Sequence, residues 1–154
     1  MRHLSLAVAV ALLVALPAAA ITYGQNDGNR HPNVGALVWI PSSGASFPFC
    51  SGTLISPTVF LTAAHCDPGV ARINVTFDPY FSSKSKLIIG TYYADPRYSQ
   101  AQDDPHDIAV VVFDQPVRIT PARLPGAGSL SSLSVGQPFT AVGYGAQEVQ
   151  NQPG

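Results

Sequence analysis

Prolines and glycines interrupt this chain at short intervals, and their spacing restricts the fold more than any other feature. The sequence contains 14 prolines and 13 glycines, spread between short apolar runs that are rich in Val, Ile, Phe and Thr. Runs of this length and composition, bounded by turn residues, are typical of β-strands. No long stretch places its apolar residues at a helical period. We therefore expect an all-β protein.

Seven segments have the composition of strands: Gly35–Ile40, Cys50–Ser56, Val59–Thr62, Ala71–Phe77, Lys86–Tyr92, Ile108–Phe113 and Phe139–Gly143. One helical turn is expected around Ala63–Cys66. The segment Asp95–Asp107 is polar and is expected to form a long loop. Between Asp114 and Pro138 the chain is rich in Pro, Gly and Ser and has little periodicity, which is typical of a linker.

The first twenty residues have the organisation of a secretory signal peptide. Arg2 and His3 form a basic start, residues 4–16 form an apolar run, and three alanines follow Pro17. The apolar run is shorter than the stretch of about 20 residues that a bilayer requires, so a signal peptide is favoured over the alternative, an uncleaved anchor. Cleavage after the last alanine would make Ile21 the first residue of a secreted mature protein.

Charge and length narrow the range of partners. Eight Lys and Arg residues against nine Asp and Glu residues give a net charge of −1. The cationic residues are scattered and form no basic patch, which argues against nucleic-acid binding. No segment after the signal peptide is long and apolar enough to span a membrane. The residues after the signal peptide are enough for one modest domain that can bury a core.

Cys50 and Cys66 are the two cysteines of the sequence. In a secreted chain two cysteines most simply form one disulfide. Two buried free thiols are the alternative.

The segment FLTAAHCDPG, residues 60–69, places His65 at the end of an apolar strand. A neutral imidazole can accept a proton from a hydroxyl, and it does so best when a carboxylate holds its other nitrogen. Asp107 is the best candidate for that carboxylate. It begins the apolar run DIAVVVF, where a carboxylate is costly unless it is hydrogen-bonded. A purely structural histidine and a turn-capping aspartate are the alternatives.

The segment CSGTLISPTVFLTAAHC, residues 50–66, closely resembles the trypsin/chymotrypsin family of serine endopeptidases. HDIAVVVF is similar to the Asp-Ile-Ala-Leu-Leu segment of that family, and HPNVGALVW looks like the family's first strand. The resemblance implies that His65 is the general base and that Asp107 orients it. It also implies a disulfide between Cys50 and Cys66.

The resemblance extends from Ile21 to about Gly145, where AVGYG is similar to the end of a later strand of the family. It implies a six-stranded Greek-key barrel over residues 21–113 and an inter-barrel linker over residues 114–138. Residues 139–154 would begin an incomplete second barrel with its first strand. Ile21 at the mature N-terminus resembles the free terminus that the family uses in activation.

The nucleophile of the family lies in a Gly-Asp-Ser-Gly-Gly motif, and these 154 residues contain neither that motif nor Gly-x-Ser-x-Gly. The family's oxyanion hole and specificity pocket also belong to its second barrel. Ser51 resembles a structural position and has no oxyanion donors beside it. The chain alone is therefore expected to be inactive as a peptidase.

Two functions are compatible with these features. The first is a secreted serine-type endopeptidase that hydrolyses peptide bonds without a cofactor. No metal is expected, because the histidines lack ligand spacing. Its partners would be protein or peptide substrates, a protein inhibitor or a missing C-terminal half. The alternative is a secreted non-catalytic binding module derived from a protease barrel, which would have no need of the pair formed by His65 and Asp107.

Overall fold

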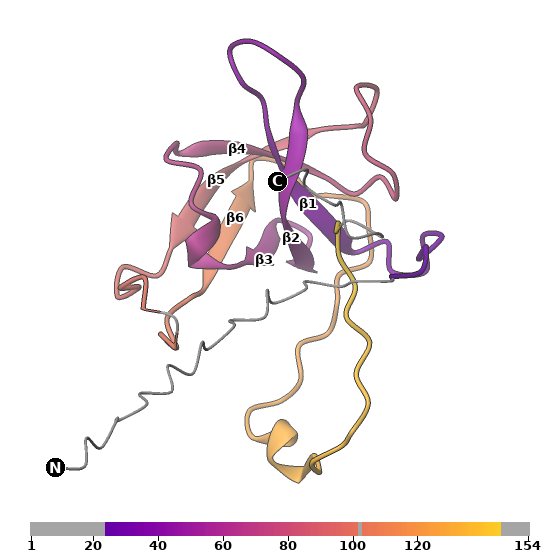
Figure 1. Ribbon diagram of the computed structural model, residues 1–154, viewed down its shortest axis with the longest axis vertical. Helices are drawn as coiled ribbons and strands as arrows, with labels where there is room; N and C mark the ends of the chain where they lie inside the picture. The colour runs from indigo at the N-terminus through magenta and orange to yellow at the C-terminus, as the bar shows by residue number, and fades with distance from the viewer. Residues whose placement is uncertain (1–23, 102, 146–154) are drawn as a thin grey trace, which may run out of the picture.

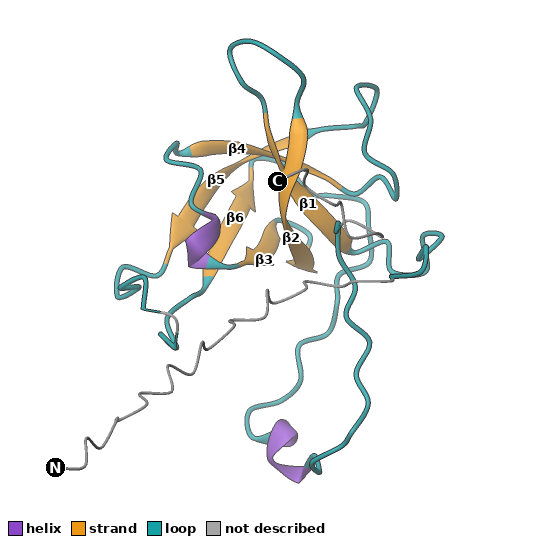
Figure 2. Ribbon diagram, viewed as in Figure 1, coloured by secondary structure: helices purple, strands orange, loops and turns teal. Residues whose placement is uncertain are grey.

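A closed six-stranded β-barrel forms the centre of the computed structural model, which describes residues 24–101 and 103–145 (Figure 1). The barrel order is β1-β2-β3-β6-β5-β4, every pair is antiparallel, and β4 closes onto β1. Loops make up most of the remaining described chain (Figure 2). The strands are β1 (Val34–Trp39), β2 (Phe47–Ser56), β3 (Val59–Thr62), β4 (Arg72–Thr76), β5 (Ile88–Ala94) and β6 (Ala109–Phe113).

The connection between β3 and β4 gives the barrel its Greek-key topology. Strands β1 to β3 form one meander, and the chain then crosses so that β4 pairs with β1 on the other side. Strands β4 to β6 form a second meander, and β6 closes the barrel beside β3. A fourth strand that lies beside the first is the defining feature of a Greek key. The predicted all-β, six-stranded barrel is confirmed.

Side chains that alternate along the strands point inward and fill the barrel interior. Phe60 is fully buried, and its ring lies 5.6 Å from that of Phe77 and 6.3 Å from that of Phe113, measured between ring centroids. Gly52 on β2 makes room for this cluster, because a Cβ there would lie 2.5 Å from the Phe60 ring and 2.4 Å from the Leu61 carbonyl oxygen. The glycine of β2 is thus required by close packing inside the barrel.

Six of the seven predicted strands form. The prediction Val59–Thr62 matches β3, whereas β5 begins and ends two residues later than the predicted Lys86–Tyr92. The predicted helical turn is present as η1, a 3₁₀ helix over Ala64–Cys66.

The prediction of a strand over Phe139–Gly143 is wrong, because this segment adopts no strand. A closed barrel offers no free edge with which a further strand could pair. The segment is instead held at its end by Tyr144. The Tyr144 backbone amide donates to Ser51 Oγ at 2.8 Å, and the Tyr144 hydroxyl donates to the carbonyl oxygen of Asp78 at 2.5 Å.

The segment predicted as a linker leaves the barrel as a long loop and returns to it (Figure 1). Before the segment leaves the barrel, the Ala122 amide donates to the Leu54 carbonyl oxygen at 2.8 Å. At its far end lies η2 (Ser129–Ser132), a 3₁₀ helix that the composition did not predict. Local hydrogen bonds from serine hydroxyls support this helix, for example from Ser131 Oγ to the Gly128 carbonyl oxygen at 2.6 Å.

The expected signal peptide and the expected mature terminus at Ile21 lie outside the described residues. Within the described residues, no helix has the length and apolar character of a membrane span.

Candidate active site

His65 lies in the single turn η1, directly after β3. Strand β3 ends at Thr62, whose buried hydroxyl donates to the Ser51 carbonyl oxygen at 3.0 Å and so fixes the strand end to β2. The residues on either side of the histidine, Ala64 and Cys66, are buried in the barrel. The His65 side chain, in contrast, is 59% exposed. The two buried neighbours therefore anchor the turn and leave the imidazole at the surface.

The predicted disulfide between Cys50 and Cys66 is confirmed, with a Cα–Cα distance of 6.2 Å. It ties η1 to β2. A ring nitrogen of His65 and both sulfur atoms lie within 4.8 Å of one another. Because thiolates and not disulfide sulfurs are metal ligands, this group is not a metal site while the bridge is intact.

Asp107 contacts His65 through both of its carboxylate oxygens. The backbone N–H of His65 donates to Oδ1 at 2.8 Å, and His65 Nδ1 lies 2.7 Å from Oδ2. A carboxylate only accepts hydrogen bonds, so this contact assigns the proton to Nδ1 and leaves Nε2 of the neutral ring free as an acceptor. The hydrogen bonds from the His65 side chain and backbone hold the pKa of the Asp107 carboxyl below its usual value.

The barrel topology explains how residues 42 positions apart meet. Strands β3 and β6 are neighbours, and Thr62 at the end of β3 pairs with Ala109 at the start of β6. His65 follows the first of these strands, and Asp107 precedes the second. Both side chains therefore emerge at the same end of the barrel.

Two further histidines in the described part of the chain are held by aspartates in the same two-point manner. Asp27 accepts from the amide of His31 at 2.9 Å and lies 2.6 Å from its Nδ1. Asp104 accepts from the amide of His106 at 2.8 Å and lies 2.8 Å from its Nδ1. These pairs span four and two residues and are local turn caps. A hydrogen bond to an aspartate therefore does not by itself distinguish His65 from the other two histidines. What distinguishes His65 is that its aspartate lies 42 residues away in the sequence.

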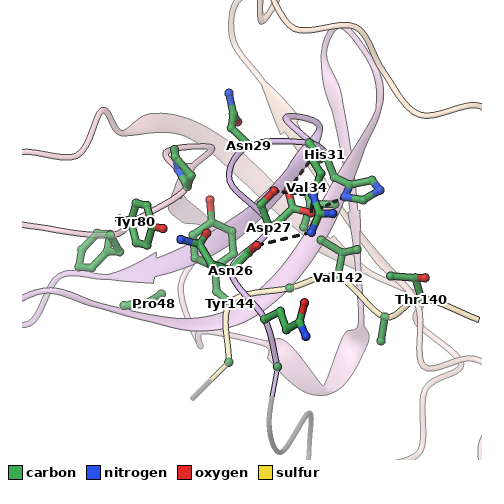
Figure 3. Close-up of a pocket in the computed structure, with 18 residues that line it drawn as sticks. Asn26, Asp27, Asn29, His31, Val34, Pro48, Tyr80, Thr140, Val142 and Tyr144 are labelled. Carbon is green, nitrogen blue, oxygen red and sulfur yellow. Dashed lines mark hydrogen bonds and ion pairs between the residues drawn. The ribbon is translucent and has the colours of Figure 1, made fainter. Parts of the chain in front are cut away.

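The His31 pair lies in a different part of the surface from His65. It lines an open pocket of about 660 Å³, in which Asp27 and His31 are hydrogen-bonded and Tyr80 and Tyr144 line other parts of the wall (Figure 3). His65 is not part of this pocket. It lines a separate hollow of about 620 Å³, which it shares with two aspartates and one tyrosine, Asp67, Asp95 and Tyr98.

The Ser51 side chain bonds the segment that contains Tyr144, and not His65. Its hydroxyl accepts the hydrogen bond from the Tyr144 amide. A Cβ at the neighbouring Gly143 would lie 2.8 Å from the same hydroxyl oxygen. Ser51 thus serves as the attachment point for the returning end of the chain.

Sequence reasoning missed Tyr92, which reaches the turn that carries His65. Its hydroxyl lies 2.8 Å from the carbonyl oxygen of Ala63 and 3.2 Å from that of Ala64, so its single proton is shared between these two acceptors. Burial raises the pKa of Tyr92 to about 12. Alternation along IIGTYYA could have placed Tyr92 on the inner face with Gly90, and a buried tyrosine hydroxyl generally needs a partner. The alternation does not show which acceptor the Tyr92 hydroxyl bonds.

The six-stranded barrel agrees with the family whose model matches the sequence. The chain belongs to the trypsin family, because a family model described as Trypsin matches residues 25–153. The predicted family is confirmed.

Two relatives and one solved structure are similar to this chain over part of their length. The chain is 27% identical over 144 residues to trypsin, alkaline C, of Manduca sexta, covering 90% of the chain and 56% of that trypsin. It is 32% identical over 108 residues to vitamin K-dependent protein C of Mus musculus, covering 64% of the chain and 23% of that protein. The chain thus spans about half the length of the trypsin and about a quarter of protein C. A solved structure titled "Structure of GrC" matches with a TM-score of 0.48 and 21% identity, covering 63% of this chain and 45% of that one.

Proposed function

We propose that this chain supplies the general base and the orienting carboxylate of a secreted serine-type endopeptidase. The observation that carries this proposal is the two-point hydrogen bonding of His65 by Asp107 across 42 residues of a trypsin-family chain. His65 is the base, and Asp107 is the residue that orients it. The Cys50–Cys66 disulfide holds the turn of the base against the barrel.

The chemistry of the pair follows from its geometry. The hydrogen bond to Asp107 keeps the proton of a neutral His65 on Nδ1, so Nε2 can accept the proton of a serine hydroxyl as the serine attacks a peptide carbonyl. The imidazolium that forms is stabilised by Asp107, whose lowered pKa keeps it ionised. The same Nε2 proton then protonates the leaving amine. None of these steps requires a metal or an organic cofactor.

This chemistry requires a nucleophilic serine. These 154 residues do not contain the Gly-Asp-Ser-Gly-Gly motif in which the family carries it. We propose that the nucleophile, the oxyanion hole and the specificity pocket come from polypeptide outside them. The 154-residue chain would then fold its barrel and form the pair, but it would not hydrolyse peptides. The substrates of the complete protein would be proteins or peptides.

Hydrolysis of a peptide amide by the native protein, isolated from its source organism, tests the proposal. His65→Ala is expected to lower kcat by about 10⁴- to 10⁶-fold, the scale of loss when a triad residue is removed. His31→Ala is the matched control, because His31 has the same aspartate contact. It is expected to leave kcat within about twofold. Unchanged hydrolysis in His65→Ala would refute the role of His65, and a folded native protein without any hydrolysis would favour the non-catalytic binding module.

A further inference from the structure

We propose that Tyr92 is a positioning residue that clamps the segment carrying His65. The importance of this clamp for catalysis rests on the proposed function of His65. The clamp itself is a feature of the fold and does not depend on that function. Tyr92 belongs to β5, which follows the histidine turn by more than 20 residues. It is 8% exposed, so its ring is fixed by packing in the barrel.

Tyr92 is attached to both ends of the connection between β3 and β4. Its hydroxyl shares its proton between the carbonyl oxygens of Ala63 and Ala64, the two residues that precede His65. Its backbone amide donates at 2.9 Å to the carbonyl oxygen of Ala71, where the same connection ends. A single residue thus spans the loop from one end to the other.

The turn needs such an external hold. The 3₁₀ helix η1 has only three residues and no side-chain hydrogen bond at its N-cap. A helical segment this short is not stable in isolation. Its own two hydrogen bonds, from Cys66 to the Ala63 carbonyl and from Asp67 to the Ala64 carbonyl, have lengths of 3.3 and 3.1 Å. The Tyr92 hydroxyl bonds these same two carbonyl oxygens from inside the barrel.

The clamp also relates the base to its carboxylate. Tyr92 pairs with Val111 across the β5–β6 ladder, and Asp107 lies four residues before Val111. One strand pair therefore fixes both the turn of His65 and the segment from which Asp107 extends. The buried hydroxyl, with its raised pKa, stays a donor throughout the neutral range in which an imidazole base works.

Tyr92→Phe tests the clamp, because it removes the hydroxyl and keeps the ring. Tyr93→Phe is the matched control, since Tyr93 is the next residue of β5 and is 56% exposed. The measurement is amide hydrogen exchange by NMR in the native protein. The reporter amides are His65, which bonds Asp107, and Cys66, which bonds Ala63.

In Tyr92→Phe, exchange at the His65 and Cys66 amides is expected to accelerate about fivefold, the factor that corresponds to one ordinary hydrogen bond. The Leu54 amide, which bonds the Asn33 carbonyl in the barrel wall, is expected to change less than about twofold. Tyr93→Phe is expected to change none of the three amides.

Two results would overturn the proposal. Either exchange at His65 and Cys66 remains unchanged in Tyr92→Phe, or all three amides accelerate equally, which would make Tyr92 an ordinary core residue. In the native protein, Tyr92→Phe is further expected to lower kcat with little change in KM. If the exchange result holds while His65→Ala keeps full activity, the proposed function fails and the clamp stands.

Discussion

Asp107 accepts two hydrogen bonds from His65, one from its backbone amide at 2.8 Å and one from its imidazole at 2.7 Å. The first bond fixes the turn relative to β6, and the second fixes the ring relative to the turn. A carboxylate that does both restrains the position of the imidazole and its tautomer together. The disulfide to Cys50 and the Tyr92 hydroxyl restrain the same turn from two other strands.

Replacing Asp107 by Asn should disable the pair without unfolding the barrel. An amide can accept only one of the two bonds well, and its NH₂ group would favour the tautomer with the proton on Nε2. If the proposed role holds, kcat of the native protein should fall by about 10⁴-fold, the loss known for the same substitution in a Ser-His-Asp triad. Asp27→Asn, at the corresponding local pair, is the control and should leave kcat unchanged. A fall in kcat of less than about tenfold in Asp107→Asn would contradict the proposed role of this carboxylate.

The loop that presents Asp107 should lose stability in acid because of Asp104. The Asp104 side chain is 5% exposed and accepts hydrogen bonds from both Ser99 and His106. These bonds hold the pKa of Asp104 well below its ordinary value of 3.8. The folded state is thus favoured while the carboxylate is ionised, above about pH 4, and this contribution is lost as the pH falls below that value.

Urea unfolding between about pH 6 and pH 2 checks this contribution. The wild-type midpoint should fall with pH, and the fall should be smaller in Asp104→Asn, which has no carboxylate to protonate. Asp103→Asn, at the exposed neighbouring position, should behave like the wild type. A slope in Asp104→Asn equal to that of the wild type would show that the loop does not depend on this carboxylate.

Loss of the disulfide should destabilise the chain substantially. Closing a loop of 16 residues lowers the entropy of the unfolded chain, which corresponds to about 3 kcal/mol of folding free energy. The double variant Cys50→Ser, Cys66→Ser should therefore unfold at a clearly lower urea concentration than the oxidised wild type. Reduction of the wild type should produce a similar shift. If reduction left the midpoint where it was, the bridge would contribute little to the turn of His65.

Gly52→Ala should be among the most damaging small substitutions in the barrel. The added methyl would overlap the Phe60 ring and the Leu61 carbonyl, and overpacking of this kind costs about 1–3 kcal/mol. Gly126→Ala is the control, because a Cβ there meets nothing within 4 Å. Thermal unfolding of the two variants should show a lower Tm only in Gly52→Ala. Equal melting of both variants would mean that the barrel relaxes around the methyl group.

The fold could be predicted because its signals are local. Short runs such as VFLT and AVVVF identify strands by themselves, and the predicted strand Val59–Thr62 coincides with β3. The two cysteines predict the Cys50–Cys66 bridge, and the positions of His65 after a strand and Asp107 before one suggest the pair. The resemblance of two short motifs to one family strengthens both predictions. The catalytic roles of the pair are still a proposal.

The remaining features depend on contacts with no local signature. The Tyr92 hydroxyl bonds carbonyl oxygens 28 and 29 residues away, and any residue type can offer a carbonyl. The segment Phe139–Gly143 has strand composition but no strand to pair with in the described barrel. The aspartate contacts of His31 and His106 arise from turns, which spacing alone does not reveal.

Labelling of the native protein with a fluorophosphonate, which reacts with activated serines, is the sharpest test of His65 as a general base. We expect a single adduct on a serine outside these 154 residues. His65→Ala should abolish labelling, while His31→Ala should retain it. A folded native protein that forms no adduct, or an adduct that persists in His65→Ala, would contradict the assignment of His65 as the base.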